Sequence, residues 1–468
     1  MYEFHDRTAE LEALRQCWES PDAQLLLLYG RRRIGKTYLL QHFLEDGKPH
    51  CYFLAAQTSL AENLAQLAEA VLRAVPGSGY TSVDLATLNA ILMFVGKVAA
   101  RQRFALVLDE FQYLAAADHS IPSQLQAWWD SDGIRSSVFL VLCGSQTSLM
   151  EGLGGPQNPL FGRFTFRYKL PPMNYRDIAQ FYASSSYSVR DKLTAYGAFG
   201  GTPRYHALLD RDRDLAWNVC RHVLSPLGLL RNEPEVLLSS SRVRDAAPYN
   251  AVLRAIAEGR TKPNEMAQAV RATAAQISFY LRGLQDLEWI ARESPFGEPP
   301  GRRAVYRIAD HFLRFWYRFV AGLRSELEFR EPEEVYRASV APNLNQFMGS
   351  QAFEDICRQY LQLRGDELTP GPIRRAGRYW SRDGRTEIDL MAELADGRFL
   401  FAECKWSSSR VDIRTYYQLR GKVASLPETR YRQEPHYALF SPAGFADELR
   451  RAADHEGILL VSGDDLLG

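Results

Sequence analysis

The sequence predicts an α/β fold for its first third, in which helices cover both faces of a parallel sheet. Three apolar runs indicate buried strands, at residues 24–29 (QLLLLY), 104–111 (FALVLDEF) and 138–145 (VFLVLCGS). Segments with helical spacing separate these runs, and strands that alternate with helices are typical of parallel sheets buried on both faces. Later in the chain, helices, a short hairpin and a second strand-rich block predict further domains.

Length and composition indicate a multidomain globular chain. Its 468 residues suggest about three or four domains. Because the formal net charge is zero, any surface for nucleic acid has to be local. The six scattered cysteines lack zinc-site spacing, which favours reduced thiols in a cytoplasmic protein. No signal-peptide core and no apolar run near the roughly 18 residues that span a bilayer is found, so no membrane partner is expected.

The first predicted strand leads directly into a glycine loop of the phosphate-binding type. Residues 30–37, GRRRIGKT, fit the pattern G-x-x-x-x-G-K-[ST], and helical spacing continues from Tyr38. Backbone N–H groups of such a loop wrap a phosphate, and the helix N-terminus adds a positive dipole. Lys36 would reach the β- and γ-phosphates of ATP, and the Thr37 hydroxyl would hold Mg²⁺. The predicted nucleotide-binding residues of the loop are Gly30, Arg31, Arg32, Arg33, Ile34, Gly35, Lys36, Thr37 and Tyr38.

The second and third strands end in polar residues. Asp109 would hold the Mg²⁺ water shell, and Glu110 would orient the attacking water as general base. Ser145 would contact the γ-phosphate. Ligands of parallel sheets bind at the carboxyl ends of the strands, so these residues should meet Lys36 there. The alternatives are a solvated carboxylate at Glu110 and a simple strand-end cap at Ser145.

Two further features are candidates for contact with the nucleotide. Arg163, in the segment LFGRF, is a candidate arginine finger, with a structural surface arginine as the alternative. The turn at residues 200–205, GGTPRY, interrupts a helical segment and could aim Pro203 or Arg204 at the nucleotide. The alternative for this turn is a plain connection between helices.

Residues 248–308 predict three helices followed by a two-stranded wing. In a winged helix-turn-helix the third helix enters the major groove of DNA and the wing meets phosphates. Gln276, Ser278 and Arg282 would be the outward polar positions of that helix, and Arg302 with Arg303 lies in the wing loop. DNA is therefore the expected macromolecular partner, and a spacer or protein-contact module is the alternative. The aromatic-rich segment that follows, HFLRFWYRFV, predicts a buried helix.

The last block carries two acidic residues and a lysine on a predicted hairpin. A turn of the Asp-Gly type would bring Asp389 close to Glu403. Lys405 is two positions after Glu403, so both side chains point to one face. Asp389, Glu403 and the Cys404 carbonyl would supply oxygen ligands to Mg²⁺, and the ion would activate a water positioned by Lys405. Glu354, from the preceding helix, would add an outer carboxylate, and Gln418, on the helix that follows, could line the same pocket.

Together these motifs resemble the archaeal-type P-loop ATPases of the AAA/STAND group. The pattern D-x₁₃-E-x-K resembles the PD-(D/E)XK nuclease core, with Ile388 where proline often precedes the aspartate. The segments that carry the resemblance are 29–37, 108–111, 161–163, 200–203, 353–354, 387–389 and 402–406. The resemblance implies a P-loop NTPase core (1–175), a helical lid (176–240), a winged helix (241–310), a helical linker (311–345) and a restriction-endonuclease-like α/β domain (346–468).

The leading functional hypothesis is an ATP-hydrolysing protein coupled to Mg²⁺-dependent DNA cleavage or processing. An alternative is a nucleotide-switched regulator whose winged helix and degenerate nuclease fold only bind DNA or protein, with nucleotide setting a homo-oligomeric state. A helicase or translocase is disfavoured because no helicase-type motif series follows Asp109. The predicted catalytic residues are Glu110, Arg163, Glu354, Asp389, Glu403 and Lys405.

Overall fold

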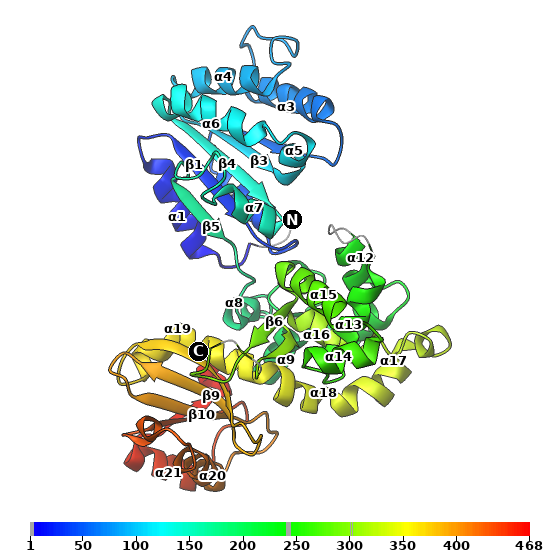
Figure 1. Cartoon of the computed structure of the whole chain (residues 1–468), viewed down its shortest axis with the longest axis vertical. Helices are drawn as coiled ribbons and strands as arrows, with labels where there is room; N and C mark the ends of the chain where they lie inside the picture. Colours follow the sequence, from blue (N-terminus) through cyan, green and yellow to red (C-terminus); the bar gives the residue numbers. More distant parts are fainter. Residues whose placement is uncertain (1–3, 240–244, 300, 302) are drawn as a thin grey trace. The chain divides into compact units, whose positions relative to one another are not determined.

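The chain folds into two compact units. The computed structural model describes residues 4–239, 245–299, 301 and 303–468. One unit comprises Met1–Pro172 with Thr202–Arg204, and the other comprises Met173–Gly201 with Tyr205–Gly468 (Figure 1). The predicted boundary at 240/241 and the predicted wing residue Arg302 lie outside the described residues.

The first unit contains the predicted parallel sheet. Its strand order is β2-β3-β4-β1-β5, and every neighbouring pair is parallel. The α/β prediction is confirmed, although the second and third predicted strands end earlier than expected, at Asp109 and Gly144. The strands are β1 (Gln24–Tyr29), β2 (His50–Leu54), β3 (Phe104–Asp109), β4 (Val138–Gly144) and β5 (Phe166–Lys169).

Helices cover both faces of this sheet (Figure 1). Alternate residues of β1 enter two different cores, since Leu26 and Leu28 pack with α1 and α2 while Leu25 and Leu27 pack with α3, α4 and α6. This explains why the strand is apolar at each position from Leu25 to Leu28 rather than alternating. The helices are α1 (Thr8–Glu19), α2 (Lys36–Leu44), α3 (Leu60–Ala74), α4 (Leu88–Ala99), α5 (Gln112–Ala117), α6 (Ile121–Ser131) and α7 (Thr147–Leu153), with a 3₁₀ turn at Gly133–Arg135.

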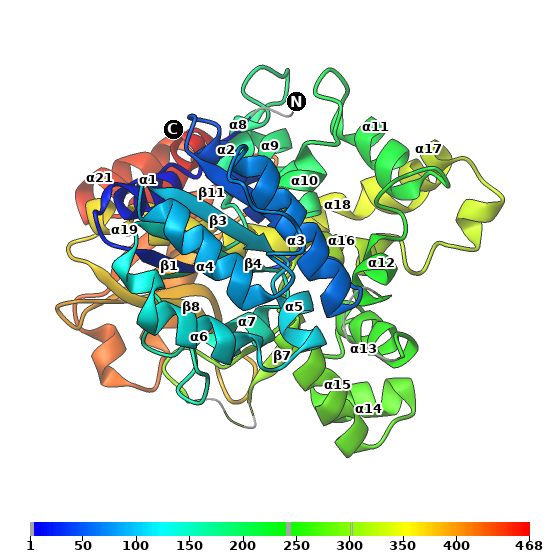
Figure 2. The same cartoon turned by 90° about the horizontal axis from the view of Figure 1, so that it is seen from above.

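The second unit begins with helices. Three of them, α13, α14 and α15, lie together (Figure 2) and are followed by the antiparallel pair β6 (Ile290–Glu293) and β7 (Val305–Ile308), as predicted. The predicted aromatic helix is α16 (His311–Phe319), and its aromatic side chains are all buried. The other helices before the second sheet are α8 (Tyr175–Gln180), α9 (Val189–Phe199), α11 (Leu215–Val219), α12 (Glu233–Ser239), α13 (Ala247–Ala257), α14 (Pro263–Val270), α15 (Ala274–Asp286), α17 (Pro332–Val335) and α18 (Ala341–Phe347), with π turns at Cys220–Leu224, Tyr336–Val340 and Met348–Ala352 and a 3₁₀ turn at Glu326–Glu328. The first two residues of the short helix α10 (Pro203–His206) belong to the first unit and its last two to the second.

The second unit ends in a mixed five-stranded sheet of order β12-β11-β10-β9-β8. The pairs β8–β9 and β9–β10 are antiparallel, whereas β10–β11 and β11–β12 are parallel. Helix α19 packs on one face and α20 with α21 on the other. The elements are α19 (Phe353–Leu368), β8 (Ile373–Trp380), β9 (Glu387–Leu394), β10 (Phe399–Cys404), α20 (Ile413–Ala424), a 3₁₀ turn (Thr429–Arg432), β11 (His436–Ser441), α21 (Asp447–Glu456), β12 (Leu459–Ser462) and α22 (Gly463–Leu467).

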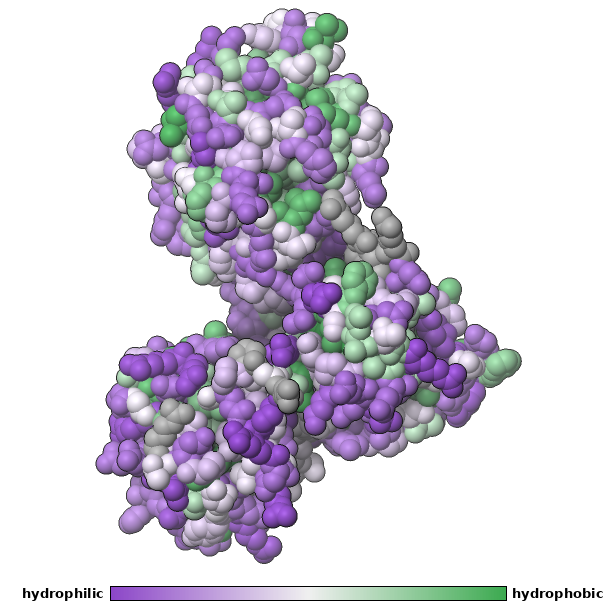
Figure 3. Space-filling model, in the orientation of Figure 1, coloured by the Kyte–Doolittle hydropathy of each residue, from purple (hydrophilic) through white to green (hydrophobic). Residues whose placement is uncertain are grey.

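Across the described residues, no helix combines the length and apolar character that crossing a membrane requires. The face of the molecule seen in Figure 3 carries mostly hydrophilic side chains, with hydrophobic ones in small groups.

Two buried histidines make the second unit sensitive to acid. Burial lowers the pKa of His206 to about 4 and that of His311 to about 3. His206 fits a neutral ring, because Nδ1 accepts from the Tyr182 hydroxyl (2.6 Å) while Nε2 donates to the Gly200 carbonyl (2.7 Å). The unfolded chain binds these protons near pH 6.5 and the folded chain does not, so stability falls as pH drops below 6.5.

We therefore expect each histidine to lower the free energy of unfolding by about 2 kcal/mol between pH 7 and pH 5. Urea unfolding at the two pH values measures this difference. His206→Gln should remove about half of the pH effect, whereas His455→Gln, at an exposed position, should leave it unchanged. Equal pH dependence in wild type and His206→Gln would contradict the assignment.

Candidate functional site

The glycine loop between β1 and α2 has the backbone conformation that its two glycines permit. Gly30 and Gly35 have φ values of 147° and 95°, which L side chains rarely adopt. A Cβ at Gly30 would lie 2.5 Å from the Leu170 carbonyl oxygen, and one at Gly35 would contact the ring of Pro203 at 3.6 Å. The structure therefore brings Pro203, predicted as a nucleotide contact, to the start of α2.

Lys36 lies inside the loop. Its Nζ donates to the carbonyl oxygens of Gly30 (2.8 Å) and Arg31 (2.9 Å). Burial lowers the pKa of this ammonium group. The loop thus holds a positive charge at its centre, where the pattern predicts phosphate contact, and a phosphate would replace these carbonyls as the partner of Nζ.

Asp109 and Thr37 meet at the sheet edge. The Thr37 hydroxyl donates to Asp109 Oδ2 at 2.7 Å, and the Glu110 N–H donates to Oδ1 at 2.8 Å. Tyr52, at the neighbouring strand β2, also donates to Oδ2, at 2.5 Å. Burial, followed by the charge of Asp109, raises the pKa of Tyr52. No sequence pattern indicated Tyr52, whose hydroxyl holds the Asp109 carboxylate beside the Thr37 hydroxyl. The Asp109 carboxylate and the Thr37 hydroxyl are oxygen ligands of the kind that Mg²⁺ prefers.

Glu110 is held by two neutral donors. It follows β3 with a φ of 53°, an uncommon value for a non-glycine residue. The Ser145 hydroxyl donates to Glu110 Oε2 at 2.7 Å, and the Gln112 amide donates to the same oxygen and to Ser145 Oγ, the latter at 3.3 Å. Gly144 leaves room for this arrangement, because a Cβ there would lie 2.4 Å from Gln112 Oε1. No sequence pattern indicated Gln112 as a residue of this site.

The other predicted residues of this region have varied surroundings. Arg32 donates to the Tyr113 hydroxyl at 3.0 Å. Arg163 forms a bidentate ion pair with Asp130, in which Nε donates to Oδ1 at 2.8 Å and Nη2 donates to Oδ2 at 2.7 Å. Contact of Arg163 with a phosphate would require this pair to break. Arg7, which the sequence analysis did not consider, is buried and donates to the carbonyls of Ile34 (3.3 Å) and Pro171 (2.7 Å). Within the loop and first turn, Ile34 is buried, Arg31 and Tyr38 are half-buried, and Arg33 is exposed.

In the second unit, the predicted acidic pair lies at adjacent ends of β9 and β10. Asp389 Oδ2 accepts from the Cys404 N–H at 2.8 Å. Glu403 is only 5% exposed, and its carboxylate receives Lys405 Nζ at 2.6 Å. Lys422, on α20, donates to both Glu403 oxygens at 3.0 Å. The sequence analysis missed Lys422, although it had placed Gln418, one turn earlier on the same helix, beside this site.

Burial is the largest influence on the pKa values of Asp389 and Glu354. It raises the pKa of Asp389, and the neighbouring Glu403 raises it further. It also raises the pKa of Glu354 to about 8 against the opposing effect of Arg378. Among the described residues no group of three His, Cys, Asp or Glu side chains is arranged to hold a metal ion. A cation bound by Asp389, Glu403 and the Cys404 carbonyl would have to displace the lysines from Glu403.

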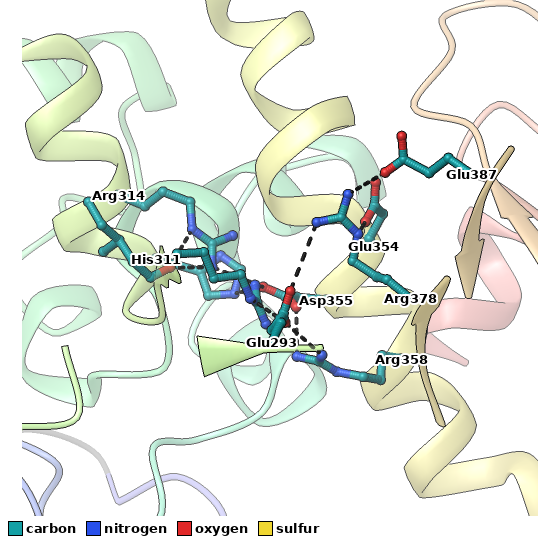
Figure 4. Close-up of polar contacts among 10 residues, drawn as sticks. Glu293, His311, Arg314, Glu354, Asp355, Arg358, Arg378 and Glu387 are labelled. Atoms are coloured by element: carbon teal, nitrogen blue, oxygen red, sulfur yellow. Dashed lines mark hydrogen bonds and ion pairs between the residues drawn. The ribbon is translucent and has the colours of Figure 1, made fainter. Parts of the chain in front are cut away.

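Glu354 is tied to a network of charged side chains (Figure 4). Arg378, on β8, contacts Glu354 at 2.9 Å and Glu387 at 2.7 Å. The same guanidinium lies 4.0 Å from Glu293 of β6. The predicted nuclease glutamate is therefore connected through one arginine to the hairpin of the helical part.

Asp355, the residue after Glu354, is the centre of this network (Figure 4). Its carboxylate contacts Arg307 at 2.7 Å, Arg314 at 3.1 Å and Arg358 at 2.7 Å. Burial alone would raise the pKa of Asp355, but the three arginines hold it well below its usual range. One buried carboxylate thus joins β7, α16 and α19.

Comparison with known proteins agrees with the fold and with the loop. An uncharacterised protein of Methanocaldococcus jannaschii is 26% identical over 446 residues, which are 93% of this chain and 95% of that protein. An uncharacterised ATP-binding protein of the same organism is 51% identical over 45 residues, or 10% of this chain and 76% of that protein. The Walker-type ATPase of Pyrococcus abyssi has a similar structure, with a TM-score of 0.51 and 20% identity over 67% of this chain and 96% of that one.

Two protein families match separate parts of the chain. Residues 4–209 match the ATPase domain predominantly from Archaea, and residues 316–416 match a family of archaeal and bacterial proteins of unknown function. The first match contains the glycine loop, Asp109, Glu110, Ser145 and Pro203. The chain is therefore similar to the ATPase domain predominantly from Archaea over residues 4–209, and to a second family, of unknown function, over residues 316–416.

Proposed function

We propose that the first unit binds ATP with Mg²⁺ at the glycine loop and hydrolyses it. The observation that carries this proposal is the placement of Lys36, Thr37, Asp109 and Glu110 at one edge of the parallel sheet. When bound, the Mg²⁺ complex of ATP supplies the phosphoryl group and a compensating positive charge. Lys36 would exchange its loop carbonyls for phosphate oxygens, and Thr37 and Asp109 would hold the ion. Glu110 orients a water and accepts its proton once Ser145 and Gln112 release the carboxylate.

Calorimetry with ATP and Mg²⁺ tests nucleotide binding. Lys36→Ala should weaken ATP binding at least tenfold, since a hydrogen bond to a charged group contributes about 1.5–3 kcal/mol. Lys97→Ala, at an exposed lysine of α4, is the matched control and should bind normally. Equal affinity in the two variants would refute the site.

We propose that the second unit acts on DNA. Helices α13–α15 with the β6–β7 hairpin have the order of a winged helix, and Gln276, Ser278 and Arg282 on α15 are exposed as predicted. The mixed sheet places Asp389, Glu403 and Lys405 together, which supports a nuclease core of the PD-(D/E)XK type with Glu354 beside it. The boundaries 176–240, 241–310, 311–345 and 346–468 for lid, winged helix, linker and nuclease-like domain belong to this proposal.

A second candidate function is a nucleotide-switched regulator that binds DNA without cutting it. It is favoured by Lys405 and Lys422, because their ammonium groups neutralise the carboxylate that a metal ion would need. In this case ATP and ADP states would differ in DNA affinity or in self-association, whereas Asp389 and Glu403 would only stabilise the sheet.

Manganese titration distinguishes the two candidates. If a metal site operates, Lys422→Met should tighten Mn²⁺ binding severalfold because it removes a competing cation, and Glu403→Gln should abolish binding and plasmid nicking. Glu428→Gln, at an exposed glutamate of the same domain, should change neither. Absence of Mn²⁺ binding in both wild type and Lys422→Met would reject the nuclease in favour of the regulator.

A further inference from the structure

The second unit contains a cavity apart from the glycine loop and the acidic pair, and Arg314 of the Asp355 network is part of its lining. Its volume is about 420 Å³, within the range of small-molecule sites in proteins. The end of α13, helix α16 and the segment that runs from α18 into the following π turn line it. The polar residues of the lining include Glu258, Arg314, Arg318, Gln346 and Gln351.

Arg314 presents a fixed positive charge in this lining. It is 4% exposed, and its Nε and Nη2 donate to the Ile308 carbonyl at 3.0 and 2.8 Å. Nη2 also contacts Asp355 (Figure 4). Nη1 has no hydrogen-bond partner among the described residues, and Arg314 is one of the residues that line the cavity. One edge of the guanidinium is therefore locked, and the other remains as a donor to the cavity.

Arg318 lies one helical turn after Arg314, on the same face of α16. It is exposed, and within the described part of the chain its guanidinium has no carboxylate partner; it lies 5.6 Å from the Phe319 ring. Asp355 does not neutralise the Arg314–Arg318 pair, because Arg307 and Arg358 share its carboxylate. The pair thus leaves positive charge in the cavity wall, suited to a phosphoryl group.

The rest of the lining favours a ligand larger than an inorganic anion. Glu258 adds a negative charge, and the carboxyl end of α13 adds carbonyl acceptors, both unfavourable to a bare phosphate. Gln346 and Gln351 supply amide groups that donate or accept. A ligand with a phosphoryl group for the arginines and hydroxyl or amino donors for Glu258 would satisfy both parts of the wall.

We propose that this cavity binds a nucleoside monophosphate. The phosphoryl group lies against Arg314 and Arg318, and hydroxyl or base amino groups of the nucleoside donate to Glu258 and the α13 carbonyls. This binding is separate from the glycine loop and does not depend on ATP hydrolysis. Because Arg314 also contacts Asp355, the bound ligand stabilises the junction between α16 and α19.

Calorimetry on the full chain carrying Lys36→Ala tests the proposal, since this background weakens nucleotide binding at the glycine loop. AMP, GMP, CMP and UMP are titrated separately, with inorganic phosphate and adenosine as the two partial probes. At least one monophosphate should bind ten times more tightly than either partial probe. Hydrogen exchange should show protection in segments 255–260 and 341–352.

Added substitutions locate the ligand. Arg318→Ala, at an exposed arginine that should not disturb folding, is expected to weaken binding at least tenfold, and Glu258→Gln should weaken it severalfold by removing an acceptor. Arg451→Ala, at an exposed arginine of α21, should have no effect. The proposal fails if no monophosphate binds, if inorganic phosphate binds as tightly, or if Arg318→Ala binds like Arg451→Ala.

Discussion

Glu110→Gln should lower the rate of ATP hydrolysis at least a hundredfold while leaving ATP affinity within about threefold of wild type. General-base catalysis contributes about 10²–10⁴-fold, and glutamine keeps the shape of the side chain without its basicity. Glutamine can still contact Ser145 and Gln112, so the local fold should persist. Single-turnover hydrolysis and ATP calorimetry on the same preparation separate the chemical step from binding.

Two further variants test whether the loss of hydrolysis is specific to the Glu110 carboxylate: one at an exposed glutamate and one at a hydrogen-bond partner of Glu110. Glu19→Gln, at an exposed glutamate at the end of α1, should hydrolyse ATP at the wild-type rate. Ser145→Ala removes one donor that restrains Glu110, and the change in rate should be smaller than for Glu110→Gln. A wild-type rate in Glu110→Gln would show that another group accepts the proton.

Local patterns were sufficient to predict the loop and three of the five strands of the first unit's sheet, but they did not indicate β2 or β5. The strand β1 has the predicted bounds, because a short apolar run that ends at a glycine is typical of a buried strand. The contact between Asp109 and Thr37 also agrees with the sequence pattern. Asp109 ends the strand β3 and Thr37 follows the loop after β1, so both lie at the edge of the parallel sheet where the strands end. The roles of these residues in ATP chemistry stay predictions until the substitutions are measured.

Two of the missed residues, Tyr52 and Lys422, have partners that are distant in the chain. Tyr52 contacts Asp109 because β2 pairs with β3 in a particular register, and nothing in HCYFL indicates that register. Gln112 contacts Glu110 only because the chain turns sharply after β3. Lys422 could have been found by extending the helical face of Gln418 by one turn, since residues four apart lie on the same side.

The charged residues around Asp355 could not be predicted either, because they come from elements that are distant in the chain. The sequence predicted a helix that carries Glu354 as an outer carboxylate, but it indicated no role for the next residue, Asp355. Its main partners, Arg307 and Arg314, are 48 and 41 positions away. Only the packing of β7 and α16 against α19 brings these charges to one carboxylate, and periodicity within a single element carries no information about that packing.

Asp355→Asn is therefore expected to destabilise the second unit by about 3–5 kcal/mol, because removing one partner of a buried charge group leaves the others uncompensated. Urea unfolding at pH 7 measures the loss. The pKa of Asp355 is held well below its usual range, so its contribution is complete above the unfolded pKa and is lost only as pH falls through the lower folded value. The difference between wild type and variant should accordingly be the same at pH 7 and pH 5.

The positive charge that Asp355→Asn leaves on the neighbouring arginines can be tested by a second substitution. Adding Arg314→Met to Asp355→Asn removes one of the uncompensated guanidinium groups, so the double variant should be more stable than Asp355→Asn alone. Asp454→Asn, at an exposed aspartate of α21, should unfold like wild type. If Asp355→Asn also unfolds within about 1 kcal/mol of wild type, the network does not hold α19 to the helical part, and the apolar core around α16 does so by itself.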